Sequence, residues 1–300
     1  MKWLVSLCLL TASLTVIAAE RVFEERFPAG ENGLLKVRLD RGDIDVISGG
    51  DEYVVKLVVS GHEEPVNDFE VTFEESGEGL NILGKGARNS SGWSFFNWSF
   101  GKHVRVHLHV TVPRTTHLDL GTSGGDISAS GTEASASVKT SGGNITLSDL
   151  KERVHVKTSG GNIRLSNSSD KHELRTSGGD IDIVNAAGDF TAKTSGGDID
   201  FKNVRGPIVC ATSGGSIDIE LTQDFGGIRA STSGGDIRLR APANIAANLK
   251  AGTSGGSVRM DLPLQVQGKI KSNRIQGTLN GGGESIHLST SGGDIRVSEL

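Results

Sequence analysis

One four-residue motif, Thr-Ser-Gly-Gly, recurs along most of this 300-residue chain and limits its fold more than any other feature. The motif occurs nine times, and the first six copies are spaced by 18 residues each. Its copies begin at Thr122, Thr140, Thr158, Thr176, Thr194, Thr212, Thr232, Thr253 and Thr290. A fixed short period predicts a solenoid, in which each repeat forms one coil and the stacked coils bury a continuous core.

Each 18-residue unit contains two short runs in which apolar and polar residues alternate. In the unit that begins at Thr176, the first run carries Ile181 and Ile183, and the second places Ala192 two positions before Thr194. Alternation with a period of two predicts strands with one buried face, and no segment shows a helical period. We therefore predict an all-β fold, a parallel β-solenoid of about 18-residue coils that follows an irregular β N-terminal part.

The Gly-Gly pair and the residue after it are predicted to form a tight corner in every coil. Glycine adopts positive φ without strain, so we expect positive φ at these glycines. The next residue is always Asp, Asn or Ser, which bond local backbone amides in turns. A calcium ladder would need charged oxygens at each level, and the Gly-Gly-x-Gly-x-Asp spacing of calcium β-rolls is absent. We predict turn chemistry, no metal and no cofactor here.

The recurring threonines raise the alternative of an ice-binding face, which would display ranked threonines on a flat sheet. Thr176 lies two positions after the inward Leu174, so alternation places it on the core side. Only one Thr recurs per coil. The ice-binding alternative is therefore disfavoured.

Two rows of charge are predicted on the outer surface of the coils. The basic row consists of Lys139, Lys157, Arg175 and Lys193. The acidic row consists of Asp182, Asp200 and Asp218. Neighbouring carboxylates about 5 Å apart would suit a retaining glycosidase, which makes a carbohydrate-active enzyme of the parallel β-helix type the alternative function. Mixed rows of exposed charge are usually a solvated face, so we predict no enzyme and no catalytic residue.

The first 19 residues resemble a secretory leader. Lys2 precedes a mostly apolar stretch over 3–17, and Ala18 and Ala19 offer the small residues of a cleavage site. No later run approaches the roughly 20 apolar residues of a membrane span, so no transmembrane segment is expected after cleavage. We expect export, with the periplasm favoured over the cell surface or secretion. The net charge of −5 gives no reason to expect nucleic acid.

The chain is divided into three parts by these patterns: a signal peptide at 1–19, an irregular β region at 20–120 and the regular solenoid at 121–300. The irregular region contains a worn copy of the repeat at 41–46, so coiling is expected to begin near Leu34. A hairpin is expected around the Gly77–Gly79 turn.

A degenerate copy near Ser272 is expected to form one altered coil. Cys210, the one cysteine outside the leader, falls at an inward position and is expected to pack in the core.

A short segment between two glycines of the irregular region is rich in aromatic residues. They are Trp93, Phe95, Phe96, Trp98 and Phe100. The favoured interpretation is a lid over the open N-terminal end of the solenoid, since terminal coils need covering. The other is an exposed aromatic patch that binds a glycan, a lipid or a partner protein. These five residues are the candidate binding residues of the chain.

Three histidines, His103, His107 and His109, alternate along one predicted strand. Histidines at alternate positions can converge on zinc, which usually takes four ligands in a structural site. Arg105 lies between them on the same face, and no Cys or Asp is in step with them. We therefore do not predict a metal site here.

The order of elements also resembles a known family. An early Gly-Asp-Ile strand and a variable hairpin precede the segment "HVTVPRTTHLDLGTSGGDI" at 109–127, and Ser-Gly-Gly-Asp-Ile units then repeat. This order resembles bacterial exported proteins of unknown function that often carry an adhesin label. The resemblance covers nearly all of the chain after the leader, and it implies a β-solenoid in the cell envelope without catalytic residues. We therefore predict an adhesin-like or envelope scaffold protein whose partner is an envelope protein or glycan.

Overall fold

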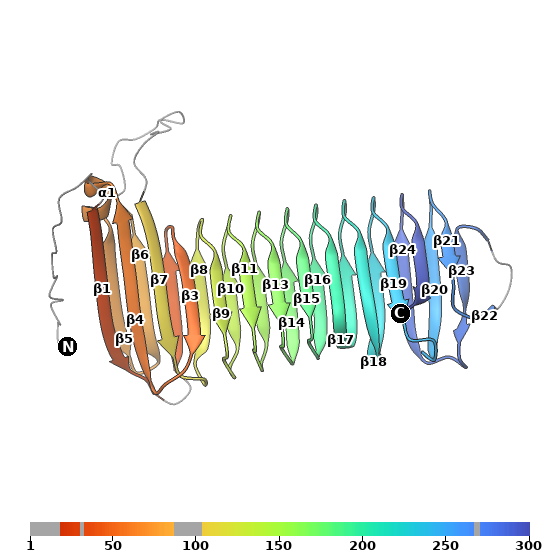
Figure 1. Ribbon diagram of the computed structural model, residues 1–300, viewed down its shortest axis with the longest axis horizontal. Coiled ribbons are helices and arrows are strands. Elements are labelled where there is room, and N and C mark those ends of the chain that lie inside the picture. The colour runs from red at the N-terminus through yellow and green to blue at the C-terminus, as the bar shows by residue number, and fades with distance from the viewer. Residues whose placement is uncertain (1–18, 31–32, 87–103, 267–270) are drawn as a thin grey trace.

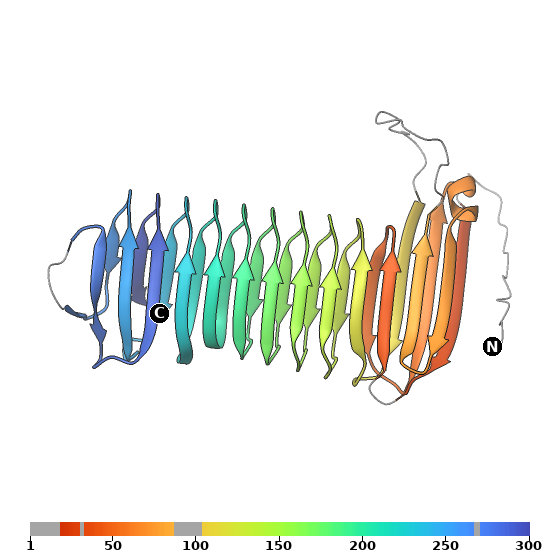
Figure 2. The same cartoon turned by 180° about the vertical axis from the view of Figure 1, so that it is seen from behind.

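The computed structural model describes residues 19–30, 33–86, 104–266 and 271–300. These residues form a long stack of coils, seen from one side in Figure 1 and from behind in Figure 2. The one helix in the described ranges, α1 (Glu63–Asn67), has five residues. No helix in these ranges is long and apolar enough to cross a membrane. The prediction of an all-β parallel β-solenoid is confirmed.

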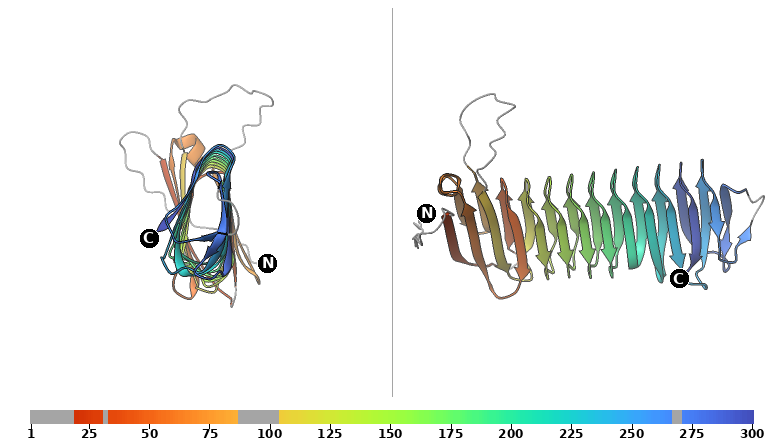
Figure 3. Two further views of the ribbon diagram at one scale, coloured as in Figure 1. Left: turned by 90° about the vertical axis from the view of Figure 1, so that its right-hand side faces the viewer. Right: turned by 45° about the horizontal axis from the view of Figure 1, so that its top comes forward.

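Each coil contributes one strand to each of two facing sheets, which flank a narrow interior in the view along the long axis (Figure 3). We call the sheet of strands that follow Gly-Gly the Ile sheet, because most of these strands begin with isoleucine. Its coil strands are β3 (Asp43–Ser48), β9 (Ile127–Ser130), β11 (Ile145–Ser148), β13 (Ile163–Ser166), β15 (Ile181–Val184), β19 (Ile237–Ala241), β25 (Ile295–Glu299) and β21 (Val258–Met260).

The second sheet consists of the strands that lead into each recurring threonine, and we call it the Thr sheet. Its coil strands are β2 (Leu34–Leu39), β8 (His117–Thr122), β10 (Ala136–Lys139), β12 (Val154–Lys157), β14 (Lys171–Arg175), β16 (Asp189–Lys193), β24 (Glu284–Thr290) and β20 (Ala247–Thr253). Two longer strands, β17 (Ile199–Ala211) and β18 (Ile217–Ser231), run through both sheets and so belong to both.

Coils pair in register, so equivalent residues form columns along the stack. Ile181 lies between Ile163 and Ile199 on neighbouring strands, and all three side chains are fully buried. Cys210 occupies the equivalent column of the Thr sheet beside Ala192 and is buried, as predicted. A single coil could not shield its own apolar face, and stacking buries the whole column at roughly 25 cal/mol per Å² of apolar surface.

The corners that need positive φ lie at the other edge of the coils from the Thr-Ser-Gly-Gly motifs. They recur every 18 residues as Gly131 (φ 82°), Asp149 (57°), Asn167 (51°), Asn185 (53°) and Asn203 (52°). No glycine of the nine motifs has positive φ, so the prediction of positive φ at Gly-Gly is wrong. Asn and Asp tolerate the left-handed region better than other non-glycine residues, which explains their column at this edge.

At the N-terminal end, the first coil in the chain is not the outermost one. Its strands β2 and β3 lie against β8 and β9 on one side and against β6 (Gly79–Lys85) and β7 (Val104–Val112) on the other. Antiparallel strands then extend both sheets: β4 (Glu52–Gly61) and β1 (Ala19–Pro28) beyond β7, and β5 (Glu70–Ser76) beyond β6. The predicted start near Leu34 and the β5–β6 hairpin are confirmed.

At the C-terminal end, likewise, the last coil in the chain is not the outermost one in the stack. The last coil, β24 and β25, lies between the coil of β18 and β19 and the earlier coil of β20 and β21, as the dark blue strands of Figure 1 show. An altered coil was predicted near Ser272, with its strand parallel to those of the other coils, and this prediction is wrong. The strand there, β23 (Arg274–Leu279), runs antiparallel both to β20 and to β22 (Gln265–Val266). Ile275 is nevertheless buried, as its apolar position predicts. The part boundaries after residues 19 and 120 remain predictions.

Candidate functional site

The second glycine of each Thr-Ser-Gly-Gly motif marks the closest approach of successive coils. A Cβ atom on Gly197 would lie 2.0 Å from the carbonyl oxygen of Gly179 and 2.4 Å from its carbon. The corresponding Cβ–oxygen distances in all nine motifs are 1.9–2.2 Å. A Cβ on the first glycine, Gly196, would meet its nearest atom at an ordinary 3.5 Å. The second glycine is therefore required for close stacking, whereas the first glycine at 196 has room for a Cβ.

The recurring threonine holds this corner from the core side. Thr194 is buried, and its Oγ1 donates to the carbonyl oxygen of Gly179 at 2.9 Å while accepting the N–H of Gly197 at 3.3 Å. The same pair of bonds recurs at Thr140, Thr158, Thr176, Thr212, Thr232, Thr253 and Thr290. The threonines are structural core groups, as their phase in the sequence predicts.

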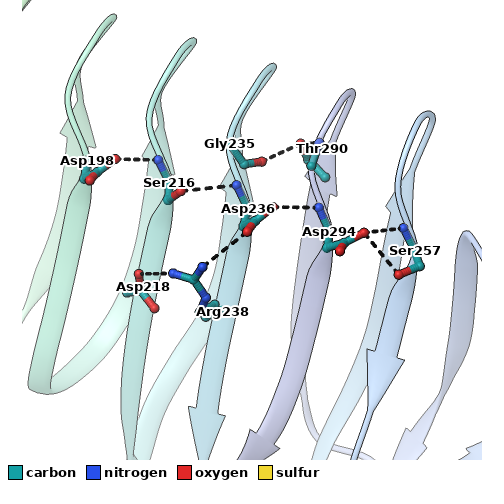
Figure 4. Close-up of polar contacts among 10 residues, drawn as sticks. Asp198, Ser216, Asp218, Gly235, Asp236, Arg238, Ser257, Thr290 and Asp294 are labelled. Atoms are coloured by element: carbon teal, nitrogen blue, oxygen red, sulfur yellow. Dashed lines mark hydrogen bonds and ion pairs between the residues drawn. The ribbon is translucent and has the colours of Figure 1, made fainter.

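The polar residue after Gly-Gly forms a ladder of hydrogen bonds along the Ile sheet (Figure 4). Asp198 Oδ1 accepts the N–H of Ser216 at 2.6 Å, and Asp236 Oδ1 accepts the N–H of Asp294 at 2.9 Å. The predicted local bond is wrong, because each side chain reaches the backbone of the next coil. The ladder runs through Asp43, Asp126, Asn144, Asn162, Asp180, Asp198, Ser216, Asp236, Asp294 and Ser257. Asp, Asn and Ser can all occupy this position, since each offers an acceptor oxygen, and the bond that Ser216 accepts is the longer one at 3.3 Å.

The acidic row lies on the outer surface of the Ile sheet, where Asp182, Asp200 and Asp218 are direct neighbours on adjacent strands. Burial raises the pKa of the Asp200 carboxyl, and the charges of Asp218 and Asp182 add to the rise. Arg164 pairs with Asp182 at 3.4 Å and Arg238 with Asp218 at 3.3 Å. The row is thus bracketed by guanidinium groups at both ends, and each outer carboxylate already has a partner.

Two of the three histidines noted in the sequence lie on one described strand. His107 and His109 lie on β7, and His107 Nε2 contacts Asp45 Oδ2 at 2.8 Å across the strand pair. His103 lies outside the described residues. Across 19–30, 33–86, 104–266 and 271–300, no three His, Cys, Asp or Glu side chains are grouped so that they could hold a metal ion.

The five candidate binding residues all lie outside the described residues, within 87–103. They are Trp93, Phe95, Phe96, Trp98 and Phe100. In the chain, this segment links β6 to β7, both of which belong to the N-terminal end of the solenoid. The choice between a lid and a binding patch therefore stays a prediction.

A shallow cavity of about 370 Å³ lies on the Thr sheet beside the Thr-Ser-Gly-Gly edge. The charged side chains that line it are three of the basic row, Lys157, Arg175 and Lys193. Recurring threonines, Ala211 and the exposed side chains of three serines also line it. The serines are Ser177, Ser195 and Ser213. From the sequence, the basic row was predicted to be a solvated face. The sequence pattern did not predict the cavity beside this row.

His172 is a buried residue that the sequence analysis missed. The residue is 1% exposed, and its ring stacks on Phe190 at 4.9 Å between centroids. Neither ring nitrogen has a hydrogen-bond partner among the described residues. Burial lowers its pKa from 6.5 to about 4, against the opposing charges of Asp170 and Asp189. The signal was present, since His172 occupies an inward position two residues before Leu174 in the alternating pattern.

Stacked parallel coils with a filled interior, closed at both ends by antiparallel strands, define this chain as a β-solenoid protein. The chain belongs to the Toastrack DUF4097 family, whose profile matches residues 34–298. No curated protein matches the sequence.

Solved structures similar to this chain come from three bacteria. A candidate cell adhesion protein from Clostridium sporogenes ATCC 15579 is 13% identical, with a TM-score of 0.27 over 93% of this chain and 100% of that one. A candidate adhesin from Bacteroides fragilis NCTC 9343 is 13% identical, with a TM-score of 0.45 over 93% and 97%. One from Parabacteroides merdae ATCC 43184 is 14% identical, with a TM-score of 0.40 over 93% and 96%.

Proposed function

We propose that this chain is an exported, non-enzymatic β-solenoid that presents its outer surface for binding or assembly in the cell envelope, in the manner of an adhesin or scaffold. The observation that carries the proposal is the filled interior. Both inward columns are occupied by buried side chains along the stack, so recognition has to use the outer faces and the ends. The leader-like residues at 1–19 support export, with the periplasm favoured over the cell surface or secretion.

The N-terminal end favours a binding role for the aromatic segment over a lid. The strands β1, β4 and β5 together with α1 already extend past the first coils, and Tyr53, Val66 and Phe69 are buried among them. An end that is already covered has less need of a further lid. Exposed aromatic side chains commonly anchor glycans and protein partners.

The alternative function, a carbohydrate-active enzyme, would have to use Asp200 and its neighbours. The raised pKa of Asp200 suits a general acid, which is the one observation in its favour. However, Arg164 and Arg238 engage the two flanking carboxylates, and the cavity described above lies on the other sheet. Both observations favour a structural use of the acidic row.

We expect the double substitution Trp93→Ala and Trp98→Ala to abolish capture of envelope material by the purified protein. Interface energy is concentrated in a few aromatic anchors, each worth roughly 2 kcal/mol or more. The measurement is a pulldown from envelope extracts with the wild type and the double variant, each checked by circular dichroism and thermal melting. Normal capture by a variant that melts much earlier would identify the segment as a lid and contradict the proposal, as would hydrolysis of a captured glycan by the wild type.

A further inference from the structure

The shallow cavity on the Thr sheet is a groove with a charge that opposes that of the whole chain. The net charge is −5, yet the groove is lined by Lys157, Arg175 and Lys193 on successive strands. Lys139 continues the same row one coil earlier, in register with Lys157. The row ends at Ala211, which pairs with Lys193 and closes the groove without charge. A local reversal of charge indicates attraction to an anion.

Most of this charge is unused within the protein. Arg175 contacts Glu173 at 2.7 Å, but Lys139, Lys157 and Lys193 have no ion pair in the part of the chain that the structure describes. Elsewhere on the surface, Arg164, Arg238, Arg240 and Arg296 each pair with a carboxylate. What distinguishes the basic row is its alignment, because three unpaired ammonium groups and Arg175 lie in register on four successive strands.

A second row of polar groups runs beside the charges. Ser177, Ser195 and Ser213 are exposed, and their hydroxyls make no hydrogen bond within the described residues. Their backbone amides, by contrast, are already bonded: the N–H groups of Ser177 and Gly178 both donate to Ser159 O, at 3.2 and 2.9 Å. The groove thus offers free cations and free hydroxyls in parallel, both repeated at the strand spacing of roughly 4.8 Å.

We propose that this groove binds an extended anionic polysaccharide with a carboxylate on each sugar, a polyuronate, laid along the long axis of the solenoid. The lysines meet successive carboxylates, and the serine hydroxyls meet the sugar hydroxyls on the other side. A repeating ligand matches the repeating row, so the small energy of each exposed ion pair is multiplied by the number of levels engaged. The groove contains no residue of the aromatic segment on which the proposed function rests.

The test is a binding titration of the purified protein with polygalacturonate at low and at physiological salt. We expect binding that weakens as salt rises, and a loss of roughly ten-fold or more in affinity for the double variant Lys157→Glu and Lys193→Glu. The matched control is Lys171→Glu with Lys250→Glu, which places the same charge change at exposed positions of the same sheet outside the row. The control is expected to bind like the wild type.

Three results would overturn the inference: no binding at low salt, equal loss in the control variant, or binding of monomeric galacturonate as tight as that of the polymer. Equal binding of polyphosphate at matched charge would overturn the uronate assignment, since it would remove any role for the serine row. Because the probe is a defined polymer and the aromatic segment is unchanged, failure here is distinct from failure of the envelope pulldown.

Discussion

The substitution Gly197→Ala is expected to destabilise the solenoid by about 3 kcal/mol or more, because the new methyl group would overlap the backbone of the preceding coil. Its Cβ would lie 2.0 Å from Gly179 O. This carbonyl oxygen belongs to the backbone and cannot rotate away as the end of a flexible side chain could. Two coils would have to separate locally, which would weaken the bonds of Thr194 and the ladder at Asp198. Urea unfolding followed by circular dichroism measures the change.

The control is the neighbouring substitution Gly196→Ala, which is expected to change the free energy of unfolding by less than about 1 kcal/mol. Its Cβ would have 3.5 Å to the nearest atom and its φ is not positive, so alanine fits and restricts the unfolded chain. If the two variants lost equal stability, close approach would not be the reason for the second glycine.

The stability of the wild-type chain is expected to fall by about 3 kcal/mol between pH 7 and pH 4 through His172 alone. The pKa of this ring is lowered by burial from 6.5 to about 4. As the pH falls below 6.5, the unfolded chain binds a proton that the folded chain refuses, so the folded state loses stability until the pH reaches about 4. Urea unfolding at a series of pH values measures this slope.

The substitution His172→Leu is expected to remove that slope and to raise stability at pH 7 by about 1–3 kcal/mol, because a buried ring with two unbonded nitrogens is replaced by an apolar side chain. His287→Leu is the control, since His287 lies on the outer surface of β24 and its removal leaves the buried ring in place. A pH slope that persisted in His172→Leu would show that other groups cause the acid sensitivity.

The fold was predictable because the repeat has a fixed period and a fixed alternation. Ile181 and Ile183 could be assigned to the core from their spacing, and the inward phase of Thr176 and Cys210 followed from the same rule. Alternation reports which side chains face inward, but it does not report φ or which coil a hydrogen bond reaches. For this reason the left-handed corners at Asn185 and its equivalents were misplaced, and the ladder was given the wrong partner.

The order of the coils was beyond what periodicity can specify. Nothing in the local pattern at Thr290 distinguishes a last coil from one inserted between two earlier coils, because every copy offers the same stacking surface. The candidate site was harder still. The basic row was visible as a pattern, whereas the groove beside it depends on the exposure of Ser177 and its equivalents at the corner. His172 was not predicted as a core residue because the alternating pattern identifies inward positions by their apolar residues, and histidine is polar.

The central claim is that Thr-Ser-Gly-Gly-Asp stacks coils through backbone contacts and hydrogen bonds, without metal. The most direct test is the melting temperature of the wild type and of Asp198→Asn, each measured in calcium and in a chelator. The ladder bond needs only an acceptor oxygen, which Asn keeps, so both proteins are expected to melt at the same temperature in both conditions. A calcium-dependent rise in the wild type that is lost in Asp198→Asn would contradict the claim, since a bound ion stabilises only the state that holds it.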